Sequence, residues 1–215
     1  MSLRNALLAM LTSQPMTGYD VYKNFQTSVG YVWHAPDSQI YPELRRMEQD
    51  GLIRGETVPW GKRGTKKRYS ITEAGVESFQ AWLNAPPEYQ RERDPVRLRA
   101  AYLEWASADA SREFFKAHIA YHSARIDDWE EMIRTLRDHS HPTLAKRLEK
   151  KSAEEADRIT AYKVFAYEGM IARARAEIEW AESGLELVGK LEGVDQTSPL
   201  DVSGTNAPAA GMNPP

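Results

Sequence analysis

The chain has 215 residues, a net charge of −3 and no cysteine, which excludes disulfides and thiolate metal sites. Its longest apolar run, residues 6–11, is far too short to span a bilayer and carries no small-x-small cleavage motif, so we expect a soluble, cytoplasmic protein. The charge is unevenly divided: residues 1–85 carry +2 and residues 86–215 carry −5. A basic first segment is compatible with nucleic-acid binding, which depends on local clusters of charge.

The first two predicted elements are short helices. Residues 3–12 place leucines on one face, and Pro15 breaks the pattern. Thr17 is predicted to cap the next helix, with Asp20 as the acidic half of a capping box, and this helix runs to about residue 27.

A third helix is predicted from residue 36 to residue 49, with Gly51 in the position of a helix-ending glycine. Its buried stripe follows the i, i+4, i+7 spacing of Ile40, Leu44 and Met47. The opposite face is lined with amide, hydroxyl and guanidinium groups: Ser38, Gln39, Pro42, Arg45, Arg46 and Gln49. Such a face is typical of a helix that reads base edges in a major groove, and a plain solvated face is the alternative.

A basic hairpin is predicted next, with β-type segments at residues 52–58 and 69–71. Gly61 and Gly64 supply the conformational freedom that its loop needs. The predicted loop carries five cations and no acidic residue: Lys62, Arg63, Lys66, Lys67 and Arg68. We expect these cations to face a negatively charged partner. A fourth helix is predicted to start at Thr72.

The prolines at 86 and 87 mark the predicted end of a first domain, residues 1–85. We expect a helical dimerisation and effector domain at residues 86–192 and a disordered tail at 193–215, where the composition turns to Pro, Gly, Ser, Thr and Asn.

Two heptad-like series run through the second domain. The first is Phe115, Ile119, His122, Ile126, Trp129, Ile133 and Leu136. The second, which we predict to be a dimer interface, is Val164, Tyr167, Ile171, Ala174, Ile178, Ala181, Leu185 and Val188. An antiparallel helix pair within one chain is the alternative, and both can hold together.

The first domain resembles the PadR family of bacterial transcriptional regulators. The resemblance is carried by Thr17-Gly18-Tyr19-Asp20, Ser38-Gln39-Ile40-Tyr41-Pro42-Glu43-Leu44, Met47-Glu48-Gln49-Asp50-Gly51-Leu52-Ile53 and Tyr69-Ser70-Ile71-Thr72. Residues 93–105 and the long helices after them look like the large C-terminal domain of the family's longer subfamily.

This resemblance implies a mainly α fold: an N-terminal winged helix-turn-helix with a two-stranded wing, and a C-terminal helical dimerisation domain. It implies a homodimeric repressor on double-stranded DNA with an inverted-repeat operator. The DNA-facing positions would be Tyr19, Ser38, Gln39, Tyr41 and Pro42 in the helices, and Lys62, Arg63, Lys66 and Lys67 in the wing. Some family members release DNA when a phenolic acid or another hydrophobic small molecule binds.

An aromatic effector is therefore expected between the two domains, against Trp105, His118 and Tyr121, for which packing is the alternative role. No cofactor, metal site or enzymatic activity is predicted, because no convergent nucleophile, base or ligand set occurs. A winged-helix protein-interaction module without DNA binding is the rival interpretation, and an acidic or apolar wing would favour it.

Overall fold

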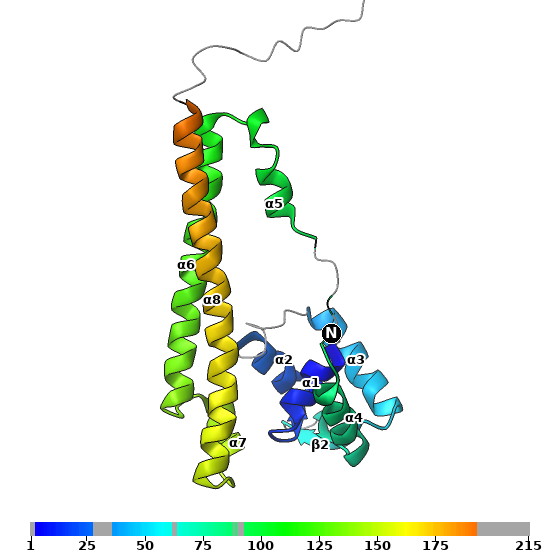
Figure 1. Cartoon of the computed structure of the whole chain (residues 1–215). Coiled ribbons are helices and arrows are strands. Elements are labelled where there is room, and N and C mark those ends of the chain that lie inside the picture. Colours follow the sequence, from blue (N-terminus) through cyan, green and yellow to red (C-terminus); the bar gives the residue numbers. More distant parts are fainter. Residues whose placement is uncertain (1–2, 28–35, 62–63, 88, 90–92, 193–215) are drawn as a thin grey trace, which may run out of the picture. The chain divides into compact units, whose positions relative to one another are not determined.

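The computed structural model describes residues 3–27, 36–61, 64–87, 89 and 93–192 (Figure 1). They fall into two compact units: unit 1 joins residues up to 93 with residues 128–169, and unit 2 joins residues 94–127 with those from 170 onward. The long helices α6 (Ala108–Arg137) and α8 (Ala153–Glu192) contribute to both units. This division differs from the boundary that the sequence favours at residue 85, and the predicted tail at 193–215 lies outside the described residues.

The first part of unit 1 has the helices and the hairpin that the sequence predicts, but the second strand of the hairpin begins at Gly64 rather than at Tyr69, so that Lys66, Lys67 and Arg68 lie in the strand and not in the loop. In chain order its elements are α1 (Leu3–Leu11), β1 (Met16–Thr17), α2 (Gly18–Thr27), α3 (Asp37–Gln49), β2 (Ile53–Trp60), β3 (Gly64–Ile71) and α4 (Glu73–Asn84). The mainly helical winged-helix fold is confirmed. One element was not predicted: the two-residue strand β1 pairs with β3, so the sheet has three antiparallel strands in the order β1-β3-β2.

Local capping explains where these helices begin. The Thr17 hydroxyl accepts a hydrogen bond from the Asp20 amide at 3.2 Å, and the Thr17 amide donates to the Asp20 carboxylate at 3.1 Å, which is the predicted capping box. Thr72 caps α4 by accepting from the Gly75 amide at 3.1 Å. Gly51 takes a φ of +74° just after α3, as a helix-ending glycine should.

The core of unit 1 is the predicted apolar stripe of α3 packed against α1, α2 and the sheet. Ile40, Leu44 and Met47 are completely buried. Arg4 of α1 ties the same helix down by ion pairs to Glu43 at 2.9 Å and Asp50 at 2.8 Å. The helix that carries the candidate DNA-reading side chains is thus fixed on its rear face by both burial and charge.

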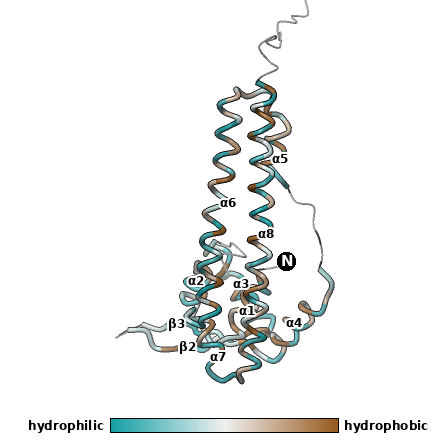
Figure 2. Tube along the Cα trace, turned by 60° about the vertical axis from the view of Figure 1, so that its left-hand side comes forward, coloured by the Kyte–Doolittle hydropathy of each residue, from teal (hydrophilic) through white to brown (hydrophobic). Residues whose placement is uncertain are grey.

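The remaining elements are helical. They are α5 (Pro95–Ala100), the 3₁₀ turn η2 (Leu103–Trp105), α6, α7 (Pro142–Leu148) and α8. In each unit a stretch of α6 lies antiparallel to a stretch of α8, and both helices alternate apolar and polar residues along their length (Figure 2). Within the described ranges, no helix combines the length and apolarity needed to cross a membrane.

The two heptad series form the contact between α6 and α8 within one chain. Phe115, Ile133 and Leu136 of the first series are buried. In the second series the members buried without any second chain are Val164, Tyr167, Ile171, Ala174 and Ala181. The intramolecular pair that was the alternative therefore accounts for most of this pattern, and a dimer interface at these residues stays a prediction.

Candidate functional site

The front face of α3 is polar and exposed, and it lies opposite the buried stripe. Ser38 and Gln39 are both exposed in the first turn of the helix, and Pro42 is half-buried one turn later. Pro42 lies inside the helix, in its second turn, and because it has no amide hydrogen it cannot donate the usual intrahelical hydrogen bond to the carbonyl of Ser38. The first turns of α3 can therefore approach a partner without any unfolding.

Two tyrosines flank this face. Tyr19 of α2 is 58% exposed and Tyr41 of α3 is 40% exposed. The Tyr41 ring lies against Gly18, where an added Cβ would come within 2.6 Å of its Cε1 atom. Gly18 thus allows the start of α2 to come close to α3, which brings the two tyrosines to one surface.

The wing is the β2–β3 hairpin, in register from Ile53↔Ile71 to Trp60↔Gly64. Gly61 follows β2 with a φ of +60°, a left-handed value that glycine adopts readily. Near the end of the hairpin, the Lys66 ammonium lies 3.7 Å from the centre of the Trp60 ring, a cation–π contact. Lys62 and Arg63, both predicted to contact DNA, lie outside the described residues.

The other wing cations have acidic partners, which the sequence analysis missed because these partners lie outside the loop. Lys67 forms an ion pair with Glu48 of α3 at 2.7 Å, and Arg68 pairs with Glu56 of β2 at 3.0 Å. Hydrogen bonding to Glu48 raises the pKa of Lys67. Lys67 therefore stays charged, but its charge is partly neutralised before any DNA arrives.

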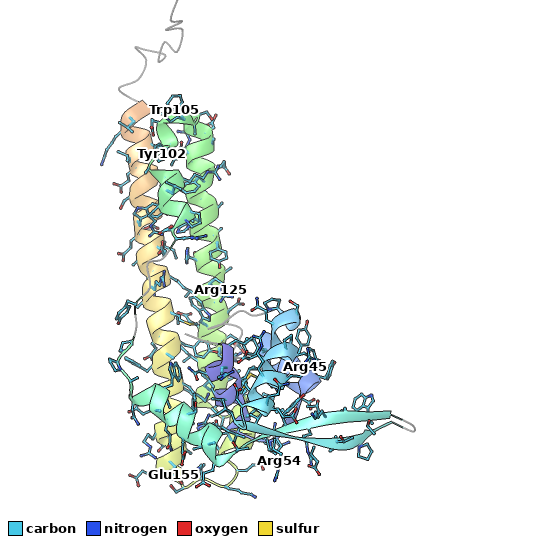
Figure 3. All side chains as sticks on the ribbon, turned by 90° about the vertical axis from the view of Figure 1, so that its right-hand side faces the viewer. Arg45, Arg54, Tyr102, Trp105, Arg125 and Glu155 are labelled. Carbon is cyan, nitrogen blue, oxygen red and sulfur yellow. The ribbon has the colours of Figure 1, made fainter. Side chains whose placement is uncertain are left out.

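Two further arginines add positive charge to this surface. Arg45 projects from α3, and Arg54 lies on β2 at the base of the hairpin (Figure 3). Both are exposed, and neither forms an ion pair in the described part of the chain. Arg45 could be recognised as part of the polar face of α3, whereas Arg54 gave no signal because Glu56 in the same strand balances its charge in the sequence.

Unit 1 also contains a partly open cavity of about 250 Å³. Its walls are mostly apolar and come from α1, α6, α7 and α8: Met10, Met132, Leu136, Leu144 and Tyr167 are among them. Three basic side chains also line it: His141, Arg147 and Lys163. Among the described residues, no carboxylate pairs with Arg147 or Lys163.

Burial lowers the pKa of all three basic side chains. It is the main cause that lowers the pKa of Lys163, with the charge of Arg147 second. Burial also lowers the pKa of Arg147 and of His141, the latter with help from Lys163. Two half-buried cations held together without an acid repel each other, and a bound anion would relieve that repulsion.

The predicted effector residues do not line this cavity. Trp105 and Tyr121 are largely exposed, and His118 is half-buried against Glu177 of α8 at 3.1 Å. The Tyr121 ring makes an edge contact with the His122 ring. Within the described ranges, the Trp105 ring contacts neither Tyr121 nor His118. The cavity could not be predicted from the sequence, because the basic side chains that line it are separated along the chain and come together only in the fold.

Comparison with known proteins gives these surfaces a context. Residues 7–81 match the model of the transcriptional regulator PadR-like family. The negative transcriptional regulator PadR of Bacillus subtilis is 28% identical over 141 residues, which cover 65% of this chain and 78% of that protein.

Two crystal structures of Bacillus subtilis PadR share the fold. The complex with operator DNA matches with a TM-score of 0.67 and 24% identity, covering 86% of this chain and 98% of the other. The complex with p-coumaric acid matches with a TM-score of 0.63 and 23% identity, covering 87% and 95%. The matched model, the curated relative and the shared winged-helix fold agree that residues 7–81 form a domain of the transcriptional regulator PadR-like family.

Proposed function

We propose that this chain represses transcription as a homodimer that binds an inverted-repeat operator and releases it when an aromatic anion binds. The observation that carries the DNA-binding part is the exposed polar face of α3 over a completely buried stripe, beside a basic hairpin. Such a helix fits the width of a major groove, and the hairpin would lie along the phosphate backbone. The negative regulator from Bacillus subtilis supports repression, and its operator complex supports DNA as the partner.

In this proposal the wing supplies affinity and α3 supplies specificity. Roughly four to eight phosphate contacts per dimer correspond to a log–log salt slope of about −4 to −7. Sequencing the DNA captured by the purified protein would identify the operator, and fluorescence anisotropy with that operator would then give the slope.

Two variants separate the two roles. Lys62→Ala with Arg63→Ala should weaken binding to all sequences alike and flatten the slope by about one unit per lost contact. Gln39→Ala should instead relax the preference at one base position, at a cost of about 1–3 kcal/mol. A double wing variant with the parent's salt slope would contradict the role assigned to the wing.

The homodimer is supported by the apolar surface of unit 2. Six large apolar side chains there are mostly exposed: Leu98, Tyr102, Trp105, Tyr121, Leu187 and Leu191. A surface of this kind usually marks an interaction site. Two copies of one winged helix joined through it would meet the two halves of an inverted repeat.

The effector is proposed to bind in the cavity of unit 1. The cavity offers apolar walls to a flat ring and two half-buried cations to a carboxylate, and its size suits a ligand with a single ring. The p-coumaric acid complex of Bacillus subtilis PadR supports this class of ligand. An effector can release DNA only if it binds more tightly to a conformation that fits the operator poorly.

A panel of phenolic and other aromatic carboxylates would test the effector. We expect members of the panel to change tryptophan fluorescence and to release operator DNA, and Lys163→Met to weaken both effects. If the whole panel leaves DNA binding unchanged, the effector part of the proposal is wrong while the DNA-binding part stands.

A further inference from the structure

Unit 2 contains a cluster of possible metal ligands that neither the DNA surface nor the cavity uses. His118 and His122 lie one turn apart on the same face of α6, and Glu177 approaches them from α8. One donor atom from each of the three residues lies within 4.8 Å of the other two. The sequence analysis missed this cluster because Glu177 is distant in the chain.

The spacing of the donors is close to what coordination requires. His118 Nε2 and a Glu177 carboxylate oxygen are 3.1 Å apart, and the His118 and His122 ring centres are 4.4 Å apart. Two ligands of a tetrahedral zinc ion, each about 2.0–2.1 Å from it, are about 3.3 Å apart. Small side-chain rotations would therefore bring all three donors onto one ion, without movement of either helix axis.

His122 has unused bonding capacity. Its Nδ1 atom is buried and has no hydrogen-bond partner in the part of the chain that the structure describes. This nitrogen is therefore available as a metal ligand.

Glu177 is held in the metal-free state by Arg97 of α5. The guanidinium lies 2.5 Å from the carboxylate and also stacks 4.2 Å from the centre of the Trp180 ring. Trp180 in turn makes an edge contact with His118 at 5.4 Å. Arg97 and an incoming cation would compete for the same carboxylate, and Trp180 would sense the exchange.

We propose that His118, His122 and Glu177 bind a divalent transition-metal ion, zinc by preference, with solvent in the remaining position. Two imidazoles and one carboxylate suit zinc and exclude the all-oxygen sites of calcium and magnesium. The bound ion ties α6 to α8 and weakens the hold of Glu177 on Arg97, which leaves α5 less firmly attached.

The test uses the full chain without a histidine tag. Isothermal titration with zinc chloride should show one ion per protomer, and cobalt should give the visible absorption of a tetrahedral nitrogen–oxygen site. Saturation should alter Trp180 fluorescence and raise the unfolding temperature, because the ion binds only the folded state. His118→Gln, His122→Gln and Glu177→Gln should each lower zinc affinity at least tenfold.

Two further variants make the result specific. Arg97→Gln removes the competing cation and should tighten zinc binding several-fold, an effect that a purely structural ion pair would not produce. His139→Gln is the matched control, since His139 is bonded to Thr160 in unit 1 and should leave zinc affinity unchanged. Circular dichroism in the presence of a chelator shows whether each variant is folded.

Absence of saturable zinc binding by the wild-type chain would overturn the proposal. So would a folded His118→Gln, His122→Gln double variant that retains the wild-type stoichiometry and affinity, because the ion would then be held elsewhere. Arg97→Gln with weaker zinc binding would show that Arg97 does not compete for Glu177.

Discussion

At the scale of single residues, the cations of the wing differ in whether an acidic side chain already neutralises them. Lys66 lies on the Trp60 ring and has no acidic partner among the described residues, whereas Lys67 must break its ion pair with Glu48 before it can bind a phosphate. Glu48 is also a negative charge on the helix proposed to enter the major groove. Both effects make Glu48 unfavourable for DNA binding.

Glu48→Gln should therefore strengthen operator binding. Lys67 can then neutralise a DNA phosphate and displace one of its counterions, so the salt slope should steepen by about one unit. Anisotropy titrations across a range of salt concentrations would measure both quantities. Glu113→Gln on α6, which breaks a comparable surface pair with Lys116, should leave them unchanged. Weaker operator binding by Glu48→Gln would show that Glu48 positions Lys67 rather than competing for it.

The half-buried Lys163 of the cavity predicts that the affinity for the proposed effector depends on pH. A carboxylate binds the charged form of Lys163, and burial with Arg147 lowers the pKa of this lysine in the free protein from its usual 10.5. Affinity should thus be full below the lowered pKa and should fall as pH rises through it, earlier than for an ordinary lysine. The other charged groups facing Lys163 are Arg147, which stays protonated, and His141, which titrates at lower pH.

Titrating an aromatic carboxylate from neutral to alkaline pH would measure this loss. Lys163→Arg keeps a permanent charge and should flatten the profile. An unchanged alkaline profile in Lys163→Arg would assign the titration to another group.

At the scale of elements, the features that could be predicted from the sequence are those set by residues close together in the chain. The Thr17–Asp20 box, the Thr72 cap and Gly51 specify helix ends within a few residues, so α1 to α4 were predictable. Strand β1 was not, because two residues carry no periodicity and exist as a strand only through pairing with β3. The ion pair of Lys67 and the cluster around Glu177 were also beyond reach, because each joins elements that are remote in sequence.

The packing of α6 on α8 makes a prediction about two glycines of α8. A Cβ at Gly184 would lie 2.4 Å from the Phe115 ring, whereas a Cβ at Gly169 would meet nothing within 4 Å. Gly184→Ala should destabilise the chain by about 1–3 kcal/mol, because the ring is buried and must move. Gly169→Ala should stabilise it by up to about 1 kcal/mol through helix propensity.

Urea unfolding of the two variants would compare them in the same helix. Equal stability of Gly184→Ala and Gly169→Ala would show that α6 and α8 do not approach closely at Phe115.

At the scale of the whole molecule, the division of apolar residues between interior and surface predicts which substitutions separate dimerisation from folding. Leu187 and Leu191 are 54% and 55% exposed and lie one turn apart on α8, whereas Ile171 is buried within the chain. Leu187→Glu with Leu191→Glu should give a folded monomer that binds the operator poorly, because one half-site supplies little affinity. Ile171→Glu should instead reduce helical content, because it buries a charge without a partner.

Sedimentation would measure the oligomeric state of each variant, and circular dichroism would measure its helical content. A folded dimer in the Leu187, Leu191 double variant would place the interface on other residues of unit 2.

The pairing of β3 on both sides has a consequence for the timing of motion in the wing. Near Tyr69 and Arg68 the strand is bonded to β1 and to β2, but from Lys67 outward only to β2, and Pro59 of β2 offers no amide. Hydrogen exchange should therefore be graded along one strand: fast by local fraying at Lys66 and Thr65, and as slow as global unfolding near Tyr69. In the proposed complex, a wing end that opens and closes repeatedly would follow variation in groove width, while α3 would stay in place.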